Sequence, residues 1–266
     1  MLEMKNVTKR FGTVAALDDL TMTVPQGGVY GLVGPNGAGK STAIRHLTGI
    51  YRPDAGTVSL NGQPIWENPK MKQIIGYIPD DVFYFPSATM EDMRRFYRGM
   101  YPSFDDALFD RLYDAFRLPK KGQIRRFSKG MQKQAAFHLT LAIRPQVMIL
   151  DEPVDGLDPV MRRQVMSLVL SDVAEHGTTV LISSHNLREL EDVCDHVGHY
   201  GSRKNAAGAL SCGYAGQHRE GAAGGADTEG SANPPRNRLR QTENPHCPGR
   251  CPDRHRAASG GQARLF

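Results

Sequence analysis

Residues 34–42 read Gly34-Pro35-Asn36-Gly37-Ala38-Gly39-Lys40-Ser41-Thr42 and fit G-x-x-x-x-G-K-[ST], the pattern of a phosphate-binding loop (P-loop). The apolar residues 29–33 before it predict a buried strand, and residues 43–47 after it favour a helix. Glycines let backbone N–H groups approach phosphate, and a helix N-terminus favours an anion. We therefore expect a nucleotide site in which Lys40 reaches the β- and γ-phosphates and Ser41 binds Mg²⁺.

Outward from this loop, predicted strands alternate with predicted helices. Residues 2–24 favour two short strands around a turn at residues 11–13, and Asn61-Gly62 closes a hairpin after the strand at 57–60. Further on we expect strands at 146–150 and 178–184, and helices at 131–143, 160–175 and 187–195. This order predicts an α/β fold with a mostly parallel sheet, flanking helices and a small N-terminal antiparallel β part.

Between about residues 80 and 145 the pattern indicates a helical insert. Aromatic residues occur at helix-compatible spacing up to Leu118: Phe83, Tyr84, Phe85, Phe96, Tyr97, Tyr101, Phe104, Phe109, Tyr113 and Phe116. Most such residues pack between helices, and the alternative is that some form a docking face for a partner.

Two further sites follow predicted core strands. The strand at 146–150 ends in Asp151-Glu152, and downstream of a P-loop this pair predicts a Mg²⁺-holding acid, Asp151, and a general base for the attacking water, Glu152. His185 ends the strand at 178–184, so we expect it beside the same site, where it contacts the γ-phosphate.

Charge and apolar runs limit the other functions. The chain carries a net charge of +5, but residues 198–266 hold ten Lys/Arg and five Asp/Glu, so the remaining part is neutral and gives no argument for nucleic acid. No apolar run is long enough for a bilayer, and the N-terminus lacks the layout of a signal peptide, which favours a cytosolic protein.

Together these motifs resemble the ATP-binding subunits of ABC transporters over residues 1 to about 197. Phe127-Ser128-Lys129-Gly130-Met131, followed by Gln132-Lys133-Gln134, resembles the signature loop of that family, and it precedes the strand ending in Glu152. The resemblance further implies that Phe11 stacks on adenine, that Asp155 and Asp158 belong to the D-loop, and that His185 is the switch histidine.

The resemblance also implies partners. In the family two such domains meet head to tail, so that Ser128, Lys129, Gly130 and Met131 would close over ATP held by a second subunit, identical or different. Transmembrane permease subunits would receive the motion, which places the protein on the cytoplasmic face of the cell membrane. The expected function is ATP hydrolysis that powers a membrane exporter. The alternatives are a soluble ATPase of this type, which usually has paired domains or long coiled coils, and a nonfunctional truncated product.

One family position is different here. Asp80, in Gly76-Tyr77-Ile78-Pro79-Asp80, stands where the family has the Q-loop glutamine, which touches Mg²⁺ and reports to the membrane subunit. A carboxylate still binds Mg²⁺, so Asp80 is a third candidate metal ligand. Together with the Lys129 and Met131 variations, this resembles a subset of bacterial exporters that includes antibiotic-efflux systems.

Residues 198–266 differ in composition from the rest. They contain no Val, Ile, Met or Trp, which predicts a disordered tail. In the adjacent reading frame, codon degeneracy lets residues 199–208 encode Ile-Met-Asp-Arg-Gly-Lys-Met-Leu-Leu-Glu, the strand-turn-strand that the family has there. We therefore interpret the tail as a frameshift near Gly198. The spacing of Cys247 and Cys251 is poor for zinc.

Overall fold

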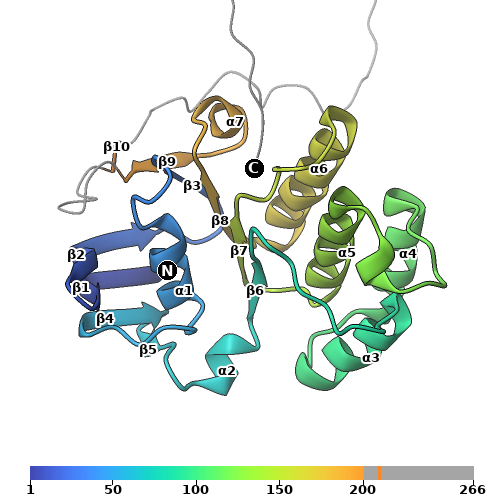
Figure 1. The fold of residues 1–266 in the computed structure, drawn as a ribbon, viewed down its shortest axis with the longest axis horizontal. Helices are drawn as coiled ribbons and strands as arrows, with labels where there is room; N and C mark the ends of the chain where they lie inside the picture. Colours follow the sequence, from blue (N-terminus) through green and yellow to red (C-terminus); the bar gives the residue numbers. More distant parts are fainter. Residues whose placement is uncertain (201–208, 211–266) are drawn as a thin grey trace, which may run out of the picture. The chain divides into compact units, whose positions relative to one another are not determined.

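A computed structural model of the chain describes residues 1–200 and the strand Ala209–Leu210. A six-stranded sheet in the order β10-β9-β3-β8-β7-β6 lies at its centre (Figure 1). Its strands are β3 (Val29–Val33), β6 (Ile75–Ile78), β7 (Val147–Asp151), β8 (Thr179–Ser184), β9 (His196–His199) and β10 (Ala209–Leu210). All pairs are parallel except β9 with β10, so the ends of β3, β7 and β8 that carry the predicted motifs lie at one edge.

The N-terminal part forms a second, antiparallel sheet in the order β2-β1-β4-β5. It contains β1 (Leu2–Phe11), β2 (Val14–Val24), β4 (Ala55–Leu60) and β5 (Gln63–Pro64). Leu20, Met22 and Val24 are buried while the residues between them are exposed, the alternation that the sequence predicts for a half-buried strand. Asn61 and Gly62 both have positive φ in the turn between β4 and β5, as a tight hairpin requires.

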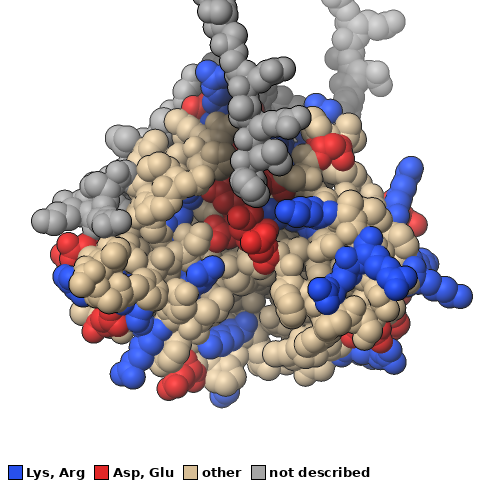
Figure 2. All heavy atoms as spheres, in the orientation of Figure 1, with Lys and Arg blue, Asp and Glu red and all other residues tan. Residues whose placement is uncertain are grey.

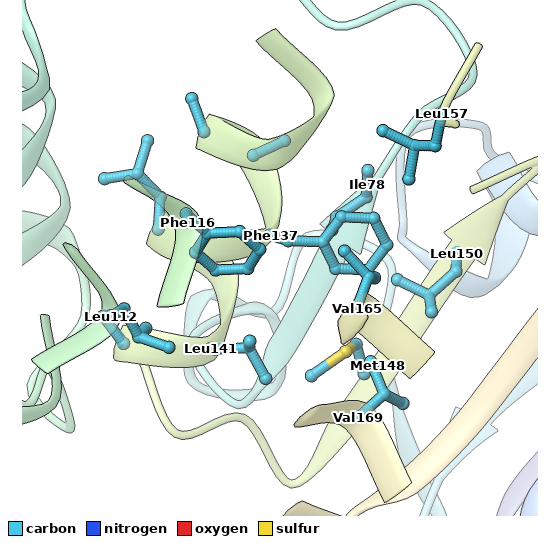
Figure 3. Packing of buried hydrophobic residues seen from close by; sticks show 14 of the residues in the cluster. Ile78, Leu112, Phe116, Phe137, Leu141, Met148, Leu150, Leu157, Val165 and Val169 are labelled. Atoms are coloured by element: carbon cyan, nitrogen blue, oxygen red, sulfur yellow. The ribbon is translucent and has the colours of Figure 1, made fainter. Parts of the chain in front are cut away.

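The parallel sheet separates two apolar cores, because successive side chains point to opposite faces. On β7, Val147 and Ile149 face the antiparallel sheet and helix α1 (Lys40–Leu47), whereas Met148 and Leu150 face helices α5 (Lys129–Ala142) and α6 (Pro159–His176). The Phe137 ring of α5 lies in the second core near Ile78 of β6, Val165 of α6 and Leu150 (Figure 3). Both faces of the sheet are therefore covered, and the predicted α/β class is confirmed.

Between β6 and β7 the chain is mainly helical. It forms α3 (Met90–Met100), α4 (Asp106–Phe116), the 3₁₀ turn η1 (Ile124–Arg126) and α5, while the short α2 (Pro69–Lys72) precedes β6. The buried His138 of α5 anchors α4, because its Nε2 lies 2.7 Å from the Phe109 carbonyl and its ring packs among Phe109, Tyr113 and Phe116. Phe83 and Phe85 are exposed instead, so these aromatic residues divide between core and surface.

The predicted helix at 187–195 is wrong in length, since α7 spans only Arg188–Glu191. Asp195 is the reason: its N–H donates to the Val29 carbonyl and its carboxylate accepts from the Val29 N–H, which turns the chain into β9. The described fold continues past Val197 to the buried Tyr200. The sequence assigned residues 198–200 and the strand Ala209–Leu210 to a disordered tail, and the predicted disorder is wrong for them. For the rest of the tail, the predicted disorder, the frameshift and the Cys247–Cys251 spacing concern residues outside the described part and stay predictions.

Candidate functional site

The P-loop joins β3 to α1 in a left-handed turn. Gly39 has φ of 116°, and a Cβ there would come within 2.7 Å of the Ala16 carbonyl oxygen, so this position accepts only glycine. Pro35, Asn36 and Gly37 are exposed, Ala38 and Thr42 are half-buried, and α1 begins at Lys40. The loop therefore presents backbone N–H groups at the start of a helix, which suits a phosphate.

Lys40, Glu152 and His185 meet at the ends of three neighbouring strands. The buried Lys40 Nζ lies 3.4 Å from Glu152 Oε1 and donates to the Gly34 carbonyl at 2.7 Å. On the other side of the carboxylate, Glu152 Oε2 is 3.0 Å from His185 Nδ1 and accepts from the His185 N–H at 3.3 Å. Hydrogen bonding to Glu152, and then its charge, raise the pKa of His185. Each oxygen of Glu152 thus has its own basic neighbour, Lys40 beside Oε1 and His185 beside Oε2.

The backbone of Glu152 is strained. Its φ is 46°, a left-handed conformation that costs a non-glycine residue of order 1–3 kcal/mol and persists only where the surroundings impose it. Its N–H donates to Ser183 Oγ at 3.1 Å, and its carbonyl accepts from Lys133 Nζ at 2.6 Å. Contacts from β8 and from α5 therefore fix the peptide that aims this carboxylate.

Two of the three predicted Mg²⁺ ligands suit the ion. Asp151 ends β7 in a buried position, where its Oδ1 accepts from Ser183 Oγ at 2.6 Å, and Ser41 lies in the first turn of α1. A hydroxyl and a carboxylate are hard oxygen donors of the kind that Mg²⁺ prefers. Asp80, the third, is exposed and pairs with Lys133, so its contact in the structure is with α5.

Phe11, the predicted adenine-stacking residue, lies at the end of β1 and is 46% exposed. Its ring meets the edge of Tyr51 with a centroid distance of 5.6 Å, and Lys9 Nζ lies 5.8 Å from its centroid. A fixed, partly open aromatic ring is a suitable surface for a nucleobase. Tyr51 escaped the sequence analysis because no motif marks it.

The signature loop lies at the start of α5. Ser128 is the N-cap, its Oγ accepting from the Met131 N–H at 3.2 Å, and the side chain of Lys129 is exposed. Gly130 packs against the D-loop (residues 155–158), since a Cβ there would lie 3.1 Å from the Gly156 carbonyl oxygen. Asp158 caps α6 by accepting from two backbone N–H groups at 3.0 Å.

The structure therefore brings together some of the predicted residues and keeps others apart. Lys40, Glu152 and His185 contact one another, whereas no hydrogen bond or ion pair within residues 1–200 joins the signature loop to the P-loop. Figure 2 shows acidic side chains gathered over β7 and β8 with a basic side chain beside them.

Two residues near the site escaped the sequence analysis. Lys133 follows the signature loop, and the signal that could have marked it is a lysine just before the mostly apolar run 135–143. The structure buries Lys133 together with the residues up to Ala142. Tyr200 is buried against the P-loop, since a Cβ added at Gly39 would come within 3.1 Å of its ring. It escaped because it falls in the segment interpreted as a tail.

Comparison with known proteins gives one family. The family model described as "ABC transporter" matches residues 17–155. The ABC transporter ATP-binding protein YtrB of Bacillus subtilis (strain 168) is 35% identical over 198 residues, which are 74% of this chain and 68% of that protein. The linearmycin resistance ATP-binding protein LnrL of the same organism is 32% identical over 204 residues, 74% of this chain and 65% of that protein.

A solved structure described as the ATP-binding subunit of an ABC transporter superposes with a TM-score of 0.69 at 30% identity, covering 75% of this chain and 85% of that one. The matched part of this chain spans about two thirds of the length of YtrB and of LnrL. In the described part of the chain, no helix is both long and apolar enough to cross a membrane.

Proposed function

Because this chain belongs to the ABC transporter family and is an ATP-binding, ATP-hydrolysing subunit, we propose that it powers a membrane exporter by closing on ATP together with a second copy of itself. The observation that carries this proposal is that the residues expected at one ATP site form two groups that do not contact each other within the chain. Lys40, Glu152 and His185 form a connected catalytic set, and the signature loop lies elsewhere on the same chain.

The catalytic set suits the hydrolysis of a phosphoanhydride. The P-loop N–H groups and Lys40 bind the phosphates of ATP, so that the ammonium exchanges its contact with Glu152 for one with the nucleotide. Glu152 then accepts a proton from the attacking water through the carboxylate that His185 orients. Mg²⁺, held by Ser41 and Asp151, would neutralise phosphate charge. Phe11 stacks on the base.

The partner in this proposal is a second copy. One chain carries both a P-loop side and a signature loop, so two copies related by a two-fold axis would each complete the site of the other. In such a pair Ser128 and the backbone at Gly130, at the N-terminus of α5, face the phosphates bound by the other copy. Two sites form at once, and each takes one half from each chain.

The exposed apolar residues of the helical part supply a face for the membrane partner. Phe83 is 81% exposed, Phe85 and Phe96 meet edge to face at 5.3 Å, and Met100 is 49% exposed. Exposed apolar side chains concentrated in residues 83–100 favour a protein contact. We propose that a permease subunit docks on this face and that the protein works on the cytoplasmic side of the membrane. The resistance function in the name of LnrL supports export as the direction.

ATP-dependent association tests the proposal. Glu152→Gln keeps the shape of the site but lacks the base, so it should bind ATP, hydrolyse it at least about 100-fold more slowly than the wild type, and elute as a dimer only when ATP and Mg²⁺ are present. ADP should leave it monomeric. A Glu152→Gln protein that binds ATP but stays monomeric at all concentrations, or that retains wild-type turnover, would contradict the proposal.

A further inference from the structure

We propose that Lys133 is a positioning residue through which Asp80 and the segment after it control the catalytic glutamate. The inference rests on the proposed function, because it concerns the regulation of that same site. It requires three things of Lys133: a contact to Glu152, a contact to Asp80, and no direct contact with the nucleotide. The first two are present in the structure, and the third follows from the burial of Lys133 on α5.

Lys133 Nζ joins three separate parts of the site. It donates to the Glu152 carbonyl at 2.6 Å and to the Asp155 carbonyl at 3.3 Å, and it lies 3.5 Å from Asp80 Oδ1. Two of the three ammonium hydrogens are thus donated to backbone carbonyls, and the Asp80 carboxylate lies close enough for an ion pair. The side chain is only 6% exposed, and a buried cation is costly unless its partners stay in place. The ammonium is therefore committed to this position.

Glu152 is the residue most sensitive to this contact. Its left-handed backbone persists because the surroundings hold the peptide, and Lys133 holds the carbonyl while Ser183 holds the N–H. Without the ammonium, the peptide can relax toward an ordinary conformation, which would swing the carboxylate away from the attacking water. Because the P-loop binds the phosphates independently, turnover should fall while ATP affinity stays.

Asp80 links the contact between Lys133 and Glu152 to the protein surface. It is 57% exposed, directly follows Pro79 at the end of β6, and begins the segment that carries the exposed Phe83 and Phe85. A cavity of about 360 Å³ between this segment, α5 and the D-loop is lined by Asp80, Lys133 and Asp155 among others, which leaves Asp80 room to move. A displacement of Asp80 by a docked partner would remove the counter-charge of Lys133 and so loosen its hold on Glu152.

A double-mutant cycle on the full chain tests this. Lys133→Met keeps the alkyl stem and should lower kcat by about tenfold, with the ATP dissociation constant unchanged within about threefold. Asp80→Asn should lower kcat by about threefold in the wild-type background and have no further effect in Lys133→Met, because it acts through the same ammonium. Lys133→Arg keeps a buried cationic donor and should recover at least about threefold over Lys133→Met. The matched control is Lys121→Met, an exposed lysine before η1, which should leave kcat unchanged.

Hydrogen exchange of the backbone at residues 151–157, measured with ADP bound, gives a readout that needs no turnover. Exchange should accelerate in Lys133→Met and remain at the wild-type rate in Lys121→Met. A wild type without ATPase activity would contradict the proposed function, and exchange would still decide the role of Lys133. Unchanged exchange, a kcat within twofold of the wild type, an equal loss of ATP affinity, or multiplying effects of the Asp80 and Lys133 changes would each overturn the inference.

Discussion

The two sides of the nucleotide-handling surface are built differently. On the P-loop side, Lys40 and Glu152 are buried, and each charged group contacts another across β3, β7 and β8. At the signature loop, Ser128 and Lys129 are exposed, and within the described residues the Ser128 hydroxyl accepts one hydrogen bond, from the Met131 N–H of its own helix. The P-loop side is thus a set of side chains that contact one another within the chain. The signature loop is a helix N-terminus with no anion-binding partner among the described residues.

The P-loop side therefore carries ATP binding and hydrolysis, whereas the signature side makes hydrolysis depend on a second molecule. A connected, buried set is positioned by the fold itself, so its residues should be required for binding and turnover in any assembly state. An exposed loop at a helix start becomes useful only against an anion brought by another molecule. Substitutions on the two sides should therefore affect different quantities.

The largest effect is expected on the P-loop side. Lys40→Met keeps the alkyl stem but removes the ammonium that the phosphates and Glu152 share, so turnover should fall at least about 100-fold and ATP affinity should fall with it. Calorimetric titration with ATP measures the affinity, and phosphate release measures turnover. Lys70→Met, an exposed lysine on α2, serves as the control. Wild-type ATP affinity in Lys40→Met would contradict the claim that the P-loop side binds the phosphates through Lys40.

A smaller effect, of a different kind, is expected on the signature side. The Cβ added by Gly130→Ala would lie 3.1 Å from the Gly156 carbonyl oxygen, so the start of α5 must shift by a few tenths of an ångström. We expect turnover to fall by about tenfold, with ATP affinity at the P-loop unchanged. The same two assays decide it. A parallel loss of both quantities would show that the two sides are not separate.

The two sides also differ in the titration of their histidines. Burial lowers the pKa of His138 on α5 to about 4, whereas the Glu152 hydrogen bond raises the pKa of His185. The unfolded chain takes up a proton at His138 as the pH falls below about 6.5, and the folded chain does so only near pH 4. This residue therefore removes stability on the order of 2 kcal/mol between pH 7 and pH 5.

The sign for His185 is opposite. Its folded pKa lies above the unfolded value, so its stabilising pair with Glu152 is fully present below about pH 6.5 and is lost as the pH rises through the folded pKa. Urea unfolding at pH 7 and pH 5 separates the two. His138→Gln should reduce the stability lost on acidification, and His185→Gln should increase it. Equal pH dependence in the wild type and His138→Gln would contradict the burial of a neutral ring.

Sequence motifs predicted that Lys40, Glu152 and His185 lie together, and they do, because the spacing of such motifs is set by the strands that carry them. A phosphate requires glycine at Gly39 and a cation at Lys40, and the strand–acid pattern marks Glu152, so the strands behind these residues followed from periodicity. The antiparallel sheet was predictable from alternation and from the Asn61-Gly62 turn.

Tertiary contacts decided what the sequence missed. The predicted helix at 187–195 ends early because Asp195 bonds to Val29, a residue far away along the chain. Lys133 had a place after the signature loop in the sequence but no role, and only the packing of α5 against the D-loop places its ammonium at the Glu152 carbonyl. The pairing of Asp80 with Lys133 was likewise invisible to a reading that assigned Asp80 to Mg²⁺.

If each site takes one half from each of two copies, two variants that are defective in different halves should rescue each other when they are mixed. Lys40→Met lacks the P-loop side, and Ser128→Arg blocks the signature side, so each variant alone should be inactive. Mixed at equal amounts and allowed to exchange, they form dimers with one intact site. We expect a recovery to about a quarter of wild-type turnover, since half of the dimers are mixed and each mixed dimer has one intact site of two. A mixture no more active than the separate variants would contradict it.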